Sequence, residues 1–184
     1  MSTFKSIEPA EATGQTKQLF DGLQRNLGMV PNLAKQLANS PAVLKAYMSW
    51  SASLSEGVLP AQLREQIAVA VASANGCDYC LSAHTVLGSL TGLKPEQLEV
   101  AQRAEAPDVR SAAALRFAVK VVAKRGHVES DDVPSLRSAG LTDAEIVEIV
   151  AVVAVNIFTN YFNHIAGTEI DFPVVHATTS AATR

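Results

Sequence analysis

Residues 63–84, LREQIAVAVASANGCDYCLSAH, predict two helices joined by a tight turn. Apolar residues of the first part recur at helical spacing, and Pro60 stands just before it, where a first helical turn accepts proline. Asn75 and Gly76 are typical of residues that end a helix. A second helix is therefore expected to run from Cys77 to Leu90.

Helical periodicity also dominates the rest of the chain, and no segment shows the apolar–polar alternation of a strand. Further helices are expected around residues 19–27, after Pro31, after Pro41, from Pro95, over 111–124, at Asp131 and Asp132, and from Thr142, with Glu145 completing a capping box. The sequence predicts an all-α single domain over residues 1–184. Its expected parts are an N-terminal helical extension at about 1–58, a core at about 59–105, a second helical half at about 106–170, and a frayed or partner-bound tail at 171–184.

Length, composition and charge exclude several classes of protein. The chain has 184 residues, 48% of them hydrophobic, which is enough for one buried core without disulfides. A net charge of −3 gives no basic face for nucleic acid or an anionic membrane. The N-terminus shows no secretory signal, and the apolar run 146–157 is too short to span a bilayer. We therefore expect a soluble, cytoplasmic protein with no nucleic-acid or membrane partner.

A weak internal repeat relates residues 83 positions apart. The aligned pairs are Leu63 and Ile146, Glu65 and Glu148, Cys77 and Asn160, Tyr79 and Phe162, and Cys80 and Asn163. Either two apolar helices resemble each other by chance, or a helical unit was duplicated and kept its chemistry in one copy. In the second case Asn160 and Asn163 are structural or line the pocket. His164 adjoins them and is a core or interface histidine, or a pocket residue.

The chemistry of the chain is expected at Cys77 and Cys80, which lie three positions apart on one face of the second helix. The first turn of a helix has free N–H groups and the positive end of the helix dipole, and both favour a thiolate. His84 follows Cys80 by four positions, so its imidazole is placed to take the thiol proton. If the two helices pack as a hairpin, Glu65 can orient that imidazole.

Three kinds of site fit this pattern. A close Cys-x-x-Cys pair in a cytosolic chain indicates redox chemistry or a metal, and in a reducing compartment it forms no permanent structural disulfide. Cys77, Cys80, His84 and Glu65 make a possible zinc set, but structural zinc sites normally draw on two ligand pairs. Free cysteines are also often buried as small hydrophobes. The turn before the pair and the histidine after it favour redox chemistry without a metal or cofactor.

Other conspicuous residues are expected to be structural. Tyr47, Met48 and Trp50 are predicted to pack in the core, although they are also suited to a pocket wall. His127 is predicted in a solvated loop, and His176 belongs to the tail.

Glu65, the run Cys77-Asp-Tyr-Cys80, and His84 resemble the signature of the alkylhydroperoxidase AhpD group within the carboxymuconolactone decarboxylase superfamily. The stretches GMVPN at 28–32 and NYFNHIAGTEIDFP at 160–173 are similar to the subgroup called peroxidase-related enzymes, so the resemblance spans most of the chain. It implies an all-helical fold that assembles into trimers or hexamers. It also implies a thiol-dependent hydroperoxide reductase that needs no haem, flavin or metal.

Carried onto this sequence, the resemblance makes Cys80 the peroxidatic thiol, Cys77 its resolving partner, and His84 and Glu65 the proton relay. The implied partners are a hydroperoxide and a dithiol electron donor, lipoyl-type or thioredoxin-like. Tyr79 departs from AhpD, which has a histidine there, and a phenol is no base at neutral pH. Two other functions stay open: a protein disulfide reductase or redox sensor, and a non-redox enzyme of the decarboxylase type.

Overall fold

The computed structural model describes residues 2–177, and within them the chain forms nine helices and no strand. The helices are α1 (Gly14–Leu27), α2 (Asn32–Leu37), α3 (Pro41–Ser55), α4 (Ala61–Ala74), α5 (Asp78–Leu90), α6 (Pro95–Ala101), α7 (Val109–Lys124), α8 (Asp132–Ser138) and α9 (Asp143–Ala166). The prediction of an all-α fold is confirmed.

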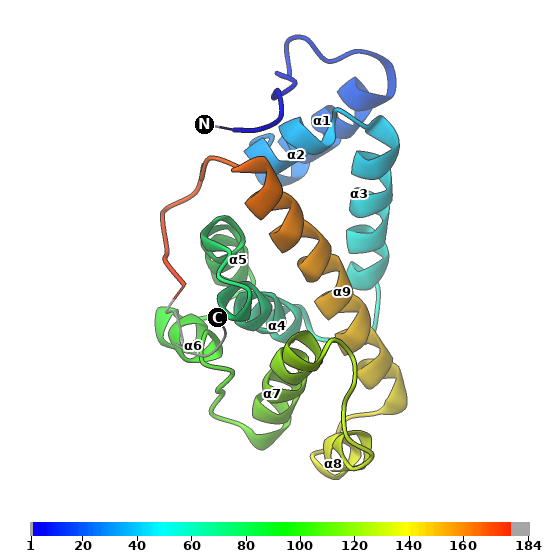
Figure 1. The fold of residues 1–184 in the computed structure, drawn as a ribbon, viewed down its shortest axis with the longest axis vertical. Coiled ribbons are helices and arrows are strands. Elements are labelled where there is room, and N and C mark those ends of the chain that lie inside the picture. The colour runs from blue at the N-terminus through cyan, green and yellow to red at the C-terminus, as the bar shows by residue number, and fades with distance from the viewer. Residues whose placement is uncertain (1, 178–184) are drawn as a thin grey trace.

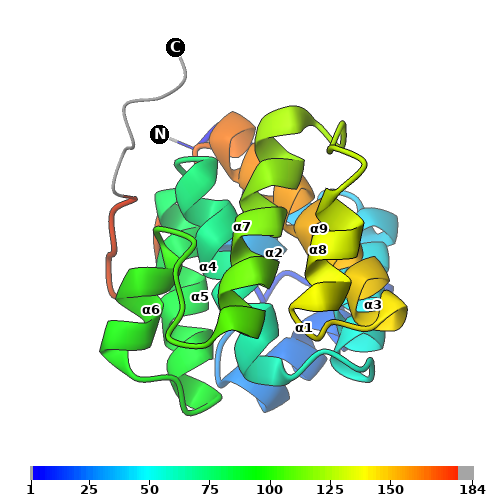
Figure 2. The ribbon, with the colours of Figure 1, turned by 90° about the horizontal axis from the view of Figure 1, so that it is seen from below.

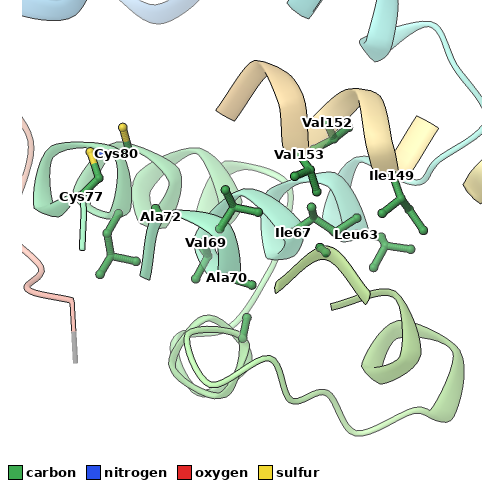
Figure 3. Close-up of a cluster of buried hydrophobic side chains, with 14 of the residues drawn as sticks. Leu63, Ile67, Val69, Ala70, Ala72, Cys77, Cys80, Ile149, Val152 and Val153 are labelled. Atoms are coloured by element: carbon green, nitrogen blue, oxygen red, sulfur yellow. The ribbon is translucent and has the colours of Figure 1, made fainter. Parts of the chain in front are cut away.

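Helix α4 lies at the centre of the fold and packs against α5, α7 and α9 (Figures 1 and 2). Its residues 66–72 are all buried, which suits a segment that is apolar on nearly every side. In Figure 3, Ile149 and Val153 of α9 face Leu63 and Ile67 of α4, and the two cysteines lie beyond the other end of α4. The apolar patterns of α4 and α9 therefore place the two helices against each other in the core.

The predicted turn between α4 and α5 is present. Gly76 has a φ of +65°, in the left-handed region that favours glycine, and Cys77 N–H donates to the Ala72 carbonyl at 2.9 Å. Helix α5 begins at Asp78, one residue later than predicted, because Cys77 has extended backbone and acts as the N-cap. The turn thus places Cys77 at the mouth of a new helix and Cys80 in its first turn.

Helix α9 begins with the predicted capping box. Thr142 Oγ1 accepts the Glu145 N–H at 3.3 Å, and Glu145 Oε2 accepts the Thr142 N–H at 2.9 Å. The apolar run 146–157, by itself too short to span a bilayer, lies within this longer helix. By length and composition α9 is able to cross a membrane, but half of its most apolar window is buried against other helices, as in a core helix.

The other predicted starts lie close to the observed ones. Proline either precedes a helix as its N-cap or is its first residue, at Pro31, Pro41, Pro60 and Pro95. Helix α7 begins at Val109, two residues before the predicted start, because Asp108 Oδ1 caps the Ser111 N–H at 2.8 Å.

Two segments far apart in sequence meet beside α5. The backbone N–H of Asn32, at the start of α2, donates to Asp171 Oδ2 at 2.7 Å. From there residues 171–177, here called the C-terminal strap, run past α5 toward α6 (Figure 1). The predicted fraying of the tail is wrong for these residues, because the strap is hydrogen-bonded to α5. The rest of the predicted tail, 178–184, lies outside the described residues.

Candidate active site

The two cysteines lie together at the N-terminus of α5, and both are free thiols. Their side chains are 1% exposed for Cys77 and 3% exposed for Cys80. Cys77 Sγ accepts the backbone N–H of Cys80 at 3.4 Å, so the N-cap thiol occupies the place that serine or aspartate normally takes. Figure 3 shows both sulfurs on the same side of α5.

The pKa values of the two thiols move in opposite directions. A hydrogen bond from the Cys77 thiol is the largest cause that lowers the pKa of Cys80 to about 7, and burial opposes it. The charge of His84 and the amides of Asn163 and Asn160 lower the Cys80 pKa further. The pKa of Cys77 is raised, first by donating that hydrogen bond and then by burial. The site therefore favours the thiolate at Cys80 and the protonated thiol at Cys77.

Two asparagines of α9 surround the Cys80 sulfur. Asn163 Nδ2 donates to Cys80 Sγ at 3.1 Å. Asn160 is fully buried, and its Oδ1 accepts from Asn75 Nδ2 at 2.8 Å. Among the described residues, Asn160 Nδ2 and Asn163 Oδ1 have no hydrogen-bond partner. Asn160 and Asn163, which the internal repeat aligns with Cys77 and Cys80, thus lie beside these cysteines.

His84 and Glu65 meet because α4 and α5 pack as a hairpin. His84 Nδ1 lies 2.8 Å from Glu65 Oε2, and both side chains are about 20% exposed. Burial lowers the pKa of His84, but the charge and hydrogen bond of Glu65 outweigh it and raise the pKa overall, with a further contribution from Cys80. With Nδ1 engaged by the carboxylate, Nε2 is the ring nitrogen left to exchange a proton.

A cavity of about 290 Å³ opens onto Cys80 and His84. Its wall is mostly apolar and comes from α1, α2, α3, α5, α9, the segment before α2 and the strap. It includes Leu23, Leu27, Met29, Leu44, Met48 and Phe172. A second cavity of about 170 Å³ lies on the side of Arg64, Glu65 and Asn156. His84 lines both cavities, so it connects an apolar space beside the thiol with a more polar one.

Tyr79 lines the larger of these two cavities and also contacts two of the segments that form its wall. The Leu33 N–H donates to the Tyr79 hydroxyl at 3.1 Å, and the Tyr79 ring meets Phe172 edge-on at 5.8 Å between centroids. Burial raises the pKa of Tyr79, so the phenol stays neutral. Tyr79 thereby ties the start of α2 and the strap to α5.

The strap is held by residues of α5 that sequence reasoning did not single out as partners. Asp78 accepts the Ala177 N–H at 2.9 Å and lies 2.7 Å from His176 Nδ1. Ser82 Oγ accepts the Val175 N–H at 2.9 Å. Burial raises the pKa of Asp78, but the Ala177 N–H and His176 outweigh it and lower the pKa overall. The strap thus stabilises the negative charge of Asp78.

Some predicted residues lie elsewhere. His164 is exposed on α9 and lines neither of the two cavities described above, because its helix face points away from the core. Trp50 was predicted in the core but is 40% exposed on the outer side of α3. Tyr47 and Met48, from the same helix, do line the cavity, and His127 lies exposed between α7 and α8 as predicted. Asp171 and Phe172 were missed, since no local pattern marks a residue that acts through a distant segment.

No three His, Cys, Asp or Glu side chains within residues 2–177 are grouped so that they could hold a metal ion. The possible zinc set of Cys77, Cys80, His84 and Glu65 therefore lacks the arrangement of a metal centre. What the site does offer is an activated thiol, a second thiol in contact with it, and a histidine–carboxylate pair.

Comparison with known proteins points to one superfamily. The family model for the carboxymuconolactone decarboxylase family matches residues 41–124, which run from the start of α3 to the end of α7. No curated protein matches the chain significantly in sequence.

Solved structures match over nearly the whole chain. An uncharacterized peroxidase-related protein from Ralstonia eutropha JMP134, described as an alkylhydroperoxidase AhpD core, is 29% identical, with 92% of each chain covered and a TM-score of 0.83. An uncharacterized peroxidase-related protein from Silicibacter sp. TM1040 is also 29% identical, covering 92% of this chain and 94% of that one, with a TM-score of 0.78. The debrominase Bmp8 shares the fold at 22% identity, with 93% of each chain covered and a TM-score of 0.79.

Proposed function

We propose that the chain, whose residues 41–124 match the carboxymuconolactone decarboxylase family model and whose fold is similar to that of an AhpD-core protein, is a thiol-dependent hydroperoxide reductase with a Cys77–Cys80 disulfide cycle. The family whose model matches is named for a decarboxylase, and a debrominase shares the fold, so the fold occurs in enzymes of different activity. The observation that carries the proposal is the pairing at the head of α5: Cys80 has a pKa of about 7, and the protonated Cys77 thiol lies against it.

In the first step the Cys80 thiolate attacks the terminal oxygen of ROOH. The S–O bond forms as the O–O bond breaks, Cys80 becomes a sulfenic acid, and the alkoxide leaving group takes a proton to give ROH. His84 supplies that proton, because Glu65 raises its pKa and so favours the protonated ring beside the thiolate. The polar cavity on the Glu65 side gives His84 a route by which to regain the proton.

In the second step the Cys77 thiol condenses with the Cys80 sulfenic acid, which gives a disulfide and one water. The two residues already touch through the Cys80 N–H and Cys77 Sγ, so little rearrangement is needed. A dithiol donor then reduces the disulfide by thiol–disulfide exchange and is itself oxidised. We propose a lipoyl-type or thioredoxin-like carrier as this donor.

The cavity supports an organic hydroperoxide as substrate. Its apolar wall suits an alkyl chain, while Cys80 and His84 receive the peroxide group.

We also propose that the protein is a cytoplasmic homo-oligomer, a trimer or hexamer. Apolar residues at helical spacing stay exposed on the outer face of α9, namely Val147, Val150, Phe158, Tyr161 and Ile165. Contiguous exposed apolar faces of this kind are common at subunit interfaces. Sedimentation velocity of the purified protein tests this, and a monomer at all concentrations contradicts it.

The function is tested by steady-state consumption of cumene hydroperoxide with dihydrolipoamide as donor. Wild-type protein should consume the peroxide, Cys80→Ser should not, and Cys77→Ser should stop after one turnover with a dimedone-reactive sulfenic acid on Cys80. Activity that survives both substitutions would contradict the proposal and favour a non-redox reaction in the same cavity.

A further inference from the structure

We propose that Asn163 is a catalytic residue, whose side-chain amide donates a hydrogen bond to the Cys80 thiolate and holds it for attack. The role in turnover rests on the proposed function, but the contact with the thiolate does not. The asparagine comes from α9, a helix that carries no thiol, 83 positions away from Cys80.

The geometry of the contact favours the ionised sulfur. Asn163 Nδ2 lies 3.1 Å from Cys80 Sγ, and the two residues are 4% and 3% exposed. An amide nitrogen only donates, and a neutral thiol is a weak acceptor, whereas a thiolate is a strong one. Because water is excluded, this hydrogen bond acts in a medium of low dielectric, where it is stronger than at a surface.

The other end of the same amide gives independent support. Asn163 Oδ1 is buried and has no hydrogen-bond partner among the described residues. An unpaired buried carbonyl is unfavourable, so the surroundings of the oxygen do not account for the presence of an asparagine at this position. The opposite orientation of the amide would turn the oxygen toward the sulfur, where it would repel a thiolate. The sulfur is therefore the partner that fixes this side chain.

Asn160, one helical turn earlier, is a second amide beside the same sulfur. Asn75 Nδ2 donates to its Oδ1 at 2.8 Å, which fixes the orientation of the amide and leaves its Nδ2 unpaired. Neither Asn160 nor Asn163 is among the residues that line the larger cavity, whereas Cys80 and His84 are. Asn163 thus stabilises the thiolate, with the Asn160 amide nearby, from a side that leaves the path of the substrate open.

The test is the pH dependence of Cys80 alkylation by iodoacetamide, with the modified residue located by peptide mass. Asn163→Leu removes the donor at similar volume, and Asn163→Asp replaces it with an acceptor. In both variants the midpoint should move to higher pH, and the rate at about pH 6 should fall roughly tenfold, as for a change of about one pKa unit.

Val153→Ala is the matched control, because it trims a buried side chain of the same helix about 15 Å along the axis from Asn163. It should lower stability without moving the midpoint. An unchanged midpoint in folded Asn163→Leu or Asn163→Asp overturns the inference, and the second variant decides if the first does not fold. Alkylation needs no peroxide, so a midpoint shift without peroxide consumption would refute the proposed function and leave this inference standing.

Discussion

Helices α4 and α9 follow the same apolar pattern for more than three turns and then diverge at one point. Helix α4 ends at Ala74, and the chain turns at Gly76 before α5 begins. Helix α9, in contrast, runs without a break through Asn160. The break creates a helix N-terminus, and the cysteines at that terminus gain free N–H groups and a favourable dipole. The unbroken helix has no such terminus at the equivalent place, and its side chains there hydrogen-bond to the first segment: Asn163 donates to Cys80 Sγ, and Asn160 accepts from Asn75 Nδ2.

The two glutamates show the same division. Glu65 orients His84 through a 2.8 Å contact in the site. Glu148, its counterpart in α9, accepts the backbone N–H groups of Val58 and Leu59 at 2.8 and 2.9 Å, and so fixes the loop that leads into α4. In the proposed mechanism the first segment carries the chemistry, and the second supports the elements that carry it.

The largest effect is expected from His84→Gln. Loss of the acid–base group should slow peroxide reduction by roughly 10²–10⁴-fold, measured as single-turnover oxidation of the reduced protein. His127→Gln is the matched control, since His127 is exposed between α7 and α8. A loss of less than about tenfold would show that His84 is not the proton donor.

The two cysteines should respond differently to pH. Because the pKa of Cys80 is lowered to about 7, its thiolate forms as pH rises through that value and is lost as pH falls through it. Alkylation of Cys80 should be about tenfold slower at about pH 6 than at about pH 8. The raised pKa of Cys77 keeps that thiol protonated and unreactive throughout. Equal alkylation of both residues would contradict the assigned roles.

Substitutions of Glu65 and Glu148 test whether the two aligned segments have different roles. Glu65→Gln removes the charge that raises the pKa of His84, so the thiolate loses a positive neighbour and alkylation at about pH 6 should slow roughly fivefold. Glu148→Gln should leave the alkylation profile unchanged. It should instead lower the free energy of unfolding by about 1–2 kcal/mol, through weaker hydrogen bonds to Val58 and Leu59. The reverse pattern would refute the division between the copies.

The smallest effect is expected at the break itself. A Cβ at Gly76 meets no heavy atom within 4 Å, so Gly76→Ala is strained only by its φ of +65°. Urea unfolding should show a loss of about 1–2 kcal/mol. An unchanged free energy of unfolding would mean that the turn relaxes without cost and that the break between α4 and α5 does not depend on glycine.

Local sequence pattern was sufficient for much of this structure. The turn at Gly76, the capping box at Thr142 and the facing positions of Cys80 and His84 follow from residue types within a few positions of each other. The approach of Glu65 followed once α4 and α5 were taken as a hairpin. The repeat pointed to Asn163, but not to its contact with the sulfur.

The parts that sequence pattern missed depend on contacts between distant segments. Asp171 and Phe172 reach the site only because the chain after α9 returns past α5, and nothing periodic marks that path. The exposure of Trp50 depends on which side of α3 faces α9, which a helix with apolar residues on several sides does not specify. The strap on Asp78 and Ser82 is likewise held by backbone N–H groups that any residue supplies.

The most direct test of the central claim is the intact mass of the fully reduced protein after one equivalent of cumene hydroperoxide. The proposed disulfide cycle predicts the loss of two hydrogen atoms as Cys77 and Cys80 form a disulfide, and no such loss in Cys80→Ser. A folded protein whose mass is unchanged and whose two thiols remain free would contradict it.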